Sequence, residues 1–99
     1  MQQMTLAQLR AAIAAGGVLS VTLRAQGPAF EVQAETRRGE AVLIDTRKKT
    51  PRRFLDPRRA MMLLREVGIR SARLDAEAWR PEQAGQEKMS RPDSAAKLK

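Results

Sequence analysis

The chain of 99 residues contains no cysteine, no histidine and no tyrosine, and it has only three aromatic side chains. Without cysteine there is no disulfide framework, and without histidine both the usual imidazole ligand of zinc and the usual base at neutral pH are missing. The four serines have no histidine to activate them, and the glycines lack the spacing of a phosphate-binding loop. We therefore expect no catalytic residue, no metal site and no cofactor, and we interpret the protein as a non-enzyme.

Long apolar runs are also absent. The longest run near the amino end, residues 11–15, is far too short for a membrane span or the apolar part of an export signal. We therefore expect a cytoplasmic protein without a membrane segment. The few large apolar residues predict a thin core, so a homodimer or a binding partner would be a natural source of added stability.

Positive charge is what the sequence has in excess, with a formal net charge of +8 at pH 7. Residues 47–59 hold seven cations against one carboxylate and supply six of these charges, whereas residues 1–46 and 60–79 each balance to zero. Unpaired cations lose their hydration in a core, so this arginine-rich segment lies in water or against a polyanion. Its cations are the predicted contacts to nucleic acid or to an acidic partner: Arg47, Lys48, Lys49, Arg52, Arg53, Arg58 and Arg59. The alternative is a solvated connection without a partner.

A first helix is predicted over residues 5–15. Its start has the capping-box pattern, in which the side chains of Thr5 and Gln8 satisfy each other's backbone donors. Gly16 and Gly17 supply the left-handed conformation that ends a helix.

Three strands are predicted to follow as an antiparallel meander. Apolar and polar residues alternate over residues 18–24 and 30–37, as expected for strands with one buried face, and Gly27 lies in the turn between them. Residues 41–44 are apolar throughout, so this strand is covered on both faces or pairs with another chain. The outer face is charged, which allows cross-strand pairs among Arg24, Glu31, Glu35 and Arg37.

Asp56 and Pro57 mark the start of a second helix, because Asp is a preferred N-cap and Pro fits the first helical position. Its apolar stripe faces the sheet. Met61 and Met62 widen this stripe, and we expect them to pack in or beside the core rather than form a methionine-rich groove.

A fourth short strand is predicted over residues 69–75, parallel to the strand it joins because a helix precedes it. Trp79 is expected to close the edge of the core, the alternative being an exposed stacking or interface residue. The predicted class is α+β with the order α-β-β-β-α-β: a helix, a three-stranded antiparallel meander, a second helix packed on one sheet face and a fourth short strand. Residues 1–80 are predicted to form a single domain, and residues 81–99 a disordered basic tail.

The order helix, three antiparallel strands, helix also resembles the double-stranded-RNA-binding domain. Lys48 and Lys49, however, precede the predicted helix start at Asp56 instead of lying in its first turn, and a fourth strand is added. The predicted sheet face has no exposed aromatic on which bases could stack. Any nucleic-acid contact is therefore expected at the arginine-rich segment and the tail.

A closer resemblance is to a family of small plasmid partition-associated (ParC-like) proteins of bacterial plasmids and integrative elements. It is carried by residues 5–13, 30–37, the run PRRFLDPR at 51–58, 63–69 and 74–83. The resemblance implies a cytoplasmic accessory of plasmid maintenance that works beside a partition ATPase and a centromere-binding protein, and it implies no catalytic residues. The leading hypothesis is binding of DNA phosphates through the arginine-rich segment. The alternative is a protein-interaction module that docks an acidic face of the partition ATPase or of another regulator.

Overall fold

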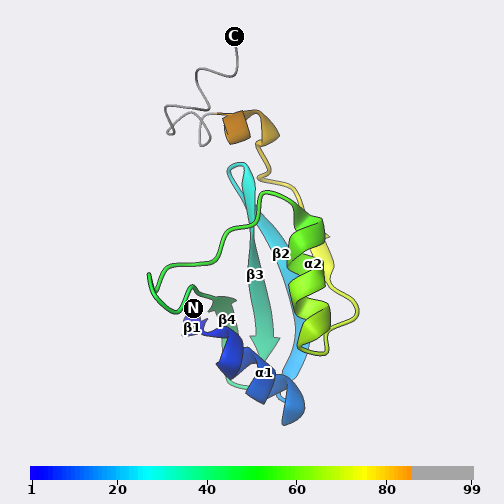
Figure 1. The fold of residues 1–99 in the computed structure, drawn as a ribbon. Helices are drawn as coiled ribbons and strands as arrows, with labels where there is room; N and C mark the ends of the chain where they lie inside the picture. Colours follow the sequence, from blue (N-terminus) through cyan, green and yellow to red (C-terminus); the bar gives the residue numbers. More distant parts are fainter. Residues whose placement is uncertain (86–99) are drawn as a thin grey trace.

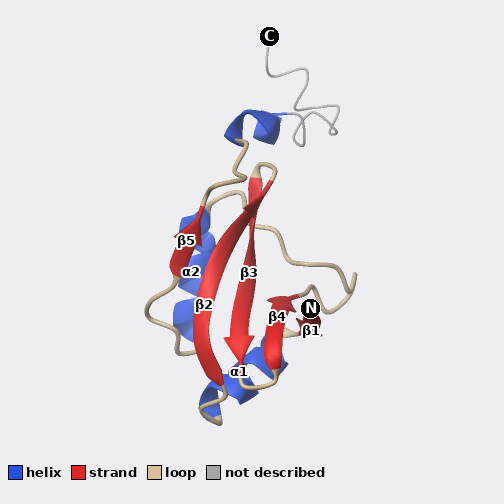
Figure 2. Ribbon diagram, turned by 180° about the vertical axis from the view of Figure 1, so that it is seen from behind, coloured by secondary structure: helices blue, strands red, loops and turns tan. Residues whose placement is uncertain are grey.

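A computed structural model of the protein describes residues 1–85 of the chain. The elements in order are β1 (Gln2–Met4), α1 (Leu6–Ala14), β2 (Val18–Gln26), β3 (Ala29–Thr36), β4 (Gly39–Leu43), α2 (Pro57–Glu66), β5 (Arg73–Asp75) and the 3-10 helix η1 (Pro81–Gln83). Both α-helices cover one face of a five-stranded sheet, and the other face is open (Figures 1 and 2). The predicted α+β class is confirmed.

The sheet has the strand order β1-β4-β3-β2-β5 and is mixed. Strands β2, β3 and β4 pair antiparallel with their neighbours, while β1 pairs in parallel with β4 and β5 in parallel with β2. The predicted α-β-β-β-α-β order is therefore incomplete, because it omits β1. The parallel direction of the last strand is confirmed, although only Arg73–Asp75 pair and not the whole of residues 69–75.

Strand β1 pairs with the edge of β4. The sequence had allowed pairing of residues 41–44 with another chain as one alternative. The backbone N–H of Ile44 donates to the carbonyl of Met4 at 2.9 Å, so the pairing extends to the end of β4. Three residues are too few to show an alternating pattern, and their strand conformation depends on the partner strand. Residues 41–44 are all buried, as their apolar character predicts.

Both helix starts are as predicted. The Thr5 hydroxyl accepts from the backbone N–H of Gln8 at 3.2 Å, and the Gln8 side chain accepts from the backbone N–H of Thr5 at 2.8 Å. Asp56 caps α2 by accepting the backbone N–H of Arg58 at 2.9 Å, with Pro57 in the first turn. Short polar side chains thus fix where each helix begins, independently of the rest of the fold.

The core lies between the helices and the sheet, and its largest fully buried side chains are Phe30, Leu9, Leu64 and Val32. The alternation in β2 fails at one position, since Leu19 is 55% exposed although the pattern placed it on the buried face. A bulge between Val18 and Ser20 shifts the register there. A bulge turns a side chain away from the face that its spacing predicts.

Trp79 was predicted to close the edge of the core, but it is 41% exposed and covers this edge only through its contact with Phe30. Its ring lies 5.4 Å from the ring of Phe30, and its indole N–H donates to the Pro28 carbonyl at 3.1 Å. The next residue is also tied to this hairpin, because the Arg80 backbone N–H donates to the Gly27 carbonyl at 2.7 Å. The chain beyond β5 is thus attached to the β2–β3 turn.

The predicted tail begins with defined structure, because Pro81–Gln83 form the 3-10 helix η1. The prediction of disorder is therefore wrong for these residues, which follow directly from the attachment at Trp79. For residues 86–99 the prediction lies outside the described part of the chain.

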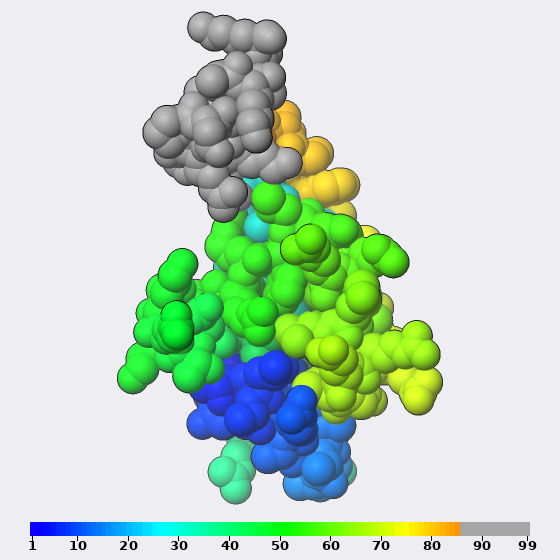
Figure 3. All heavy atoms as spheres, in the orientation of Figure 1, coloured from blue at the N-terminus to red at the C-terminus, as the bar shows by residue number. Residues whose placement is uncertain are grey.

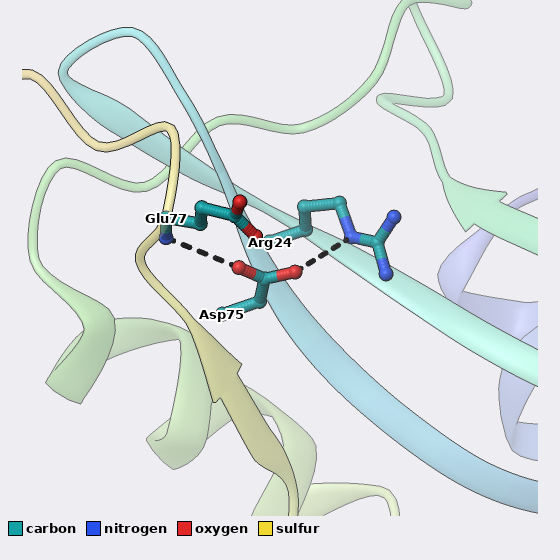
Figure 4. A network of polar contacts seen from close by, with 3 residues as sticks. All are labelled: Arg24, Asp75 and Glu77. Carbon is teal, nitrogen blue, oxygen red and sulfur yellow. Dashed lines mark hydrogen bonds and ion pairs between the residues drawn. The ribbon is translucent and has the colours of Figure 1, made fainter.

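The charged outer face of the sheet is arranged differently from the prediction. Arg24 lies opposite Glu31 in the register, but its Nε lies 3.5 Å from the Asp75 carboxylate on β5 (Figure 4). The other oxygen of Asp75 accepts the backbone N–H of Glu77 at 3.1 Å, which fixes the turn after β5. Arg37 donates from Nε to the Gly16 carbonyl at 3.3 Å. The fourth predicted strand thus supplies a partner for Arg24 that the predicted cross-strand pairs did not include.

Candidate nucleic-acid interface

The chain leaves the sheet after β4 and forms a closed loop over residues 45–50, here named the basic loop. The backbone N–H of Asp45 donates to the Thr50 carbonyl at 2.8 Å, and that of Lys49 donates to the Asp45 carbonyl at 2.7 Å. The Asp45 carboxylate accepts the backbone N–H groups of Arg47 at 2.8 Å and Lys48 at 3.0 Å. Such an aspartate turn holds the loop in one conformation without support from a core.

These hydrogen bonds also determine the ionisation of Asp45. The backbone N–H groups of Lys48 and then Arg47 lower the pKa of the carboxyl below its ordinary value of 3.8, and the charges of Lys48 and Arg52 act in the same direction. A carboxylate that accepts backbone N–H groups is favoured in its charged form. The single acidic side chain of the basic loop is therefore engaged with the backbone of its own turn.

The cations at the tip of the basic loop, Arg47, Lys48 and Lys49, are all exposed. Lys49 has a φ of 57°, and it is the one residue other than glycine with a positive φ among residues 1–85. In Figure 3 the loop stands out at the left of the body, apart from α2 at the right. Three consecutive positive charges are thus presented together on a projecting turn.

After the loop, the chain returns to the sheet beside β3. Pro51 bridges to Ile44, and the backbone N–H of Arg52 donates to the Leu43 carbonyl at 2.9 Å. Phe54 and Phe30 then exchange two backbone hydrogen bonds of 2.8 and 2.9 Å. This second attachment could not be predicted, since residues 51–54 show no strand pattern. It makes the arginine-rich segment a tethered part of the fold.

Arg52 and Arg53 have partners within the protein. The Arg52 guanidinium lies 5.3 Å from the centre of the Phe54 ring, a distance typical of a cation–π contact. Arg53 donates from Nη2 to the Gln26 carbonyl at 3.0 Å, and its Nη1 lies 3.8 Å from the Glu31 carboxylate. The Glu31 carboxylate thus balances part of the Arg53 charge. The sequence predicted all seven cations as equivalent contacts and did not predict this ion pair.

Arg58 and Arg59 lie in the first turn of α2, where both are exposed and where no acidic residue is present. The amino end of a helix already carries a partial positive charge, so these arginines add to it. Figure 1 places the start of α2 near the β2–β3 hairpin and the basic loop beside β1 and β4. The seven predicted cations therefore form two separate groups, with Arg52 and Arg53 between them.

The described part of the chain contains neither a cluster of metal-binding side chains nor a helix that could span a membrane. No three acidic side chains of residues 1–85 gather closely enough to hold a metal ion. None of the three helices in residues 1–85 is long and apolar enough to cross a membrane. Compared with known proteins, the chain has no significant match among family models, curated proteins or solved structures, so the resemblance to partition-associated proteins stays a prediction from the sequence.

Proposed function

We propose that the protein is a non-enzymatic accessory of plasmid partition or maintenance and that it binds DNA phosphates through the basic loop, assisted by Arg58 and Arg59. The plasmid setting comes from the sequence resemblance, and the phosphate-binding role from the loop. The observation that carries this role is the exposure of Arg47, Lys48 and Lys49 on a turn whose only carboxylate accepts hydrogen bonds from its own backbone.

Preorganisation supports this role. A flexible lysine-rich segment loses backbone entropy when it binds, whereas the basic loop is already closed by hydrogen bonds in the free protein. The positive φ of Lys49 also supports this role. Glycine would adopt this conformation without strain, whereas a residue with a side chain is disfavoured in it. The presence of lysine instead of glycine is therefore consistent with a function for the lysine charge.

The proposed binding is to the phosphate backbone, with little base specificity. Phosphate contacts supply affinity and orientation, whereas bases are read by bidentate side chains in the grooves. Helix α2 contains neither asparagine nor glutamine, the residues that usually read adenine. We therefore expect similar affinities for unrelated DNA sequences of equal length.

A salt titration tests the proposal. The protein is titrated with fluorescent duplexes of random and of centromere-like sequence at several salt concentrations, and the association constant is measured by anisotropy. Binding to phosphates predicts a linear fall of log K with log salt, with a slope of about −0.9 for each phosphate contact. A flat salt dependence, or no binding at low salt, would overturn the proposal.

A further inference from the structure

A second surface lies along the outer side of α2. It is a groove of about 390 Å³ formed by the helix and the segment that follows it. Its lining residues are Arg58, Met61, Met62, Arg65, Ile69 and Arg70. Positions 58, 61, 62 and 65 share one side of a helix, because they are three, four and seven residues apart. The groove is therefore a continuous strip along α2.

The floor of the groove is apolar. Met61 and Ile69 pack against the core with part of their surface, whereas Met62 is 56% exposed. The sequence predicted both methionines to pack in or beside the core. Met61 does so, whereas Met62 lies mostly in solvent, because the opposite side of α2 already fills the core with Ala60 and Leu64. Exposed methionine is flexible and polarisable, and it is common at surfaces that accept varied apolar partners.

The rim of the groove is positive. Arg58 lies at the start of α2, Arg65 in its last turn and Arg70 just beyond it, and no carboxylate is among the lining residues. DNA phosphates would use these charges but gain nothing from the methionines. The combination instead complements a ligand that carries both carboxylates and apolar side chains.

We propose that this groove binds an acidic amphipathic helix of another protein. The partner's apolar side chains lie on Met61, Met62 and Ile69, and its carboxylates pair with the three arginines, as in other complexes where a helix lies in a groove. Neither α-helix of a second copy of this chain fits, since α1 contains no acidic residue and α2 contains only Glu66. Residues 86–99 do not fit either, because they hold four cations against two carboxylates. The site does not depend on DNA binding by the basic loop, and Arg58 is the one residue that the two proposed surfaces share.

The probe is a fluorescent synthetic peptide of about 15 residues, a length that allows a helix to form on binding. Leucines at helical spacing form one face, and glutamates occupy the flanks. The matched control peptide has the same composition in scrambled order, so it has the same charge but no apolar face. We expect the full-length protein to bind the amphipathic peptide at least about tenfold more tightly, because the scrambled peptide cannot bury its leucines together.

Two variants test the groove, and a third is a control. Met62→Gln removes the exposed apolar contact, and the double variant Arg65→Gln/Arg70→Gln removes two rim charges outside residues 47–59. Arg10→Gln, on α1, removes an exposed charge away from the groove. We expect both groove variants to lower peptide affinity by about tenfold and Arg10→Gln to leave it unchanged. Thermal melting of each variant verifies the fold.

Three results would overturn the proposal. Equal affinity for the two peptides would show attraction by charge alone. An unchanged affinity in folded Met62→Gln would show that the methionine floor is not used. If Arg65→Gln/Arg70→Gln weakened duplex DNA binding as much as peptide binding, the groove would belong to a nucleic-acid surface. Loss of DNA binding with retained peptide binding in a basic-loop variant would support two independent sites.

Discussion

The Oδ1 atom of Asp45 accepts the backbone N–H of Lys48 at 3.0 Å, so the one acidic side chain of the basic loop shapes the turn that presents the neighbouring cations. The charge of this carboxylate still interacts with Lys48 and Arg52. Its hydrogen bonds to the backbone hold Arg47, Lys48 and Lys49 together at the tip of the loop.

The order of the basic loop is expected to depend on pH. The pKa of Asp45 is lower in the folded loop than the ordinary 3.8, so its contribution to stability is present above about pH 4 and is lost as pH falls through the folded pKa. The backbone amide signals of Arg47 and Lys48 should therefore shift together in an NMR titration, with a midpoint below 3.8. In Asp45→Asn these signals should not titrate. A midpoint at or above the ordinary value in the parent protein would contradict the loop geometry.

Trp79→Ala is expected to destabilise the fold by about 1–3 kcal/mol, less than for a fully buried tryptophan because the side chain is partly exposed. The variant loses both the contact with Phe30 and the hydrogen bond to Pro28. Trp79→Phe keeps a ring and should lose about half as much or less. Urea denaturation followed by circular dichroism measures both. Equal stability of Trp79→Ala and the parent would mean that the attachment at the hairpin is not formed.

Leu64→Ala is expected to cost about 2–4 kcal/mol, because Leu64 is fully buried and its truncation leaves a cavity in a thin core. Arg65→Ala, one position along the same helix, should be near neutral since its side chain is exposed. The two variants form a matched pair for chemical denaturation. The reverse order of stability would show that α2 is rotated about its axis.

Deleting residues 86–99 is expected to leave the domain folded, since Met89 and Leu98 are the only large apolar residues of that segment. The melting temperature should change by less than about 5 °C, which corresponds to roughly 1 kcal/mol in a domain of this size. Deleting residues 79–99 instead removes the contact between Trp79 and Phe30, and should lower the melting temperature further. Similar melting temperatures for the two truncated proteins would contradict the role of Trp79.

The parts of the fold that the sequence predicted are those with local causes. Thr5 with Gln8, and Asp56 with Pro57, determine the two helix starts through contacts within one turn. The parts that it did not predict depend on distant partners. Strand β1 forms because β4 offers an edge, and Leu19 turns outward because a bulge shifts the pairing of β2 with β3.

The candidate site shows the same division. Charge counting located the arginine-rich segment, but it could not show that Arg53 lies against Glu31 or that Asp45 closes a loop. The sequence also could not show how far Met62 is exposed, because a stripe of apolar residues does not reveal how wide a face the sheet covers. The basic loop is separated from the start of α2 because the chain returns to the sheet between them, where Phe54 pairs with Phe30. The sequence does not show this pairing.

The most direct test compares two variants that lose the same charge in different places. One carries Arg47→Gln, Lys48→Gln and Lys49→Gln in the basic loop, and the other carries Arg10→Gln, Arg38→Gln and Arg73→Gln at exposed positions outside both sites. The measurement is the slope of log K against log salt for duplex DNA. We expect the loop variant to lose about three units of slope, and the control variant to keep the parent's slope. Equal losses in the two variants would show that net charge alone attracts DNA and that the basic loop is not the binding site.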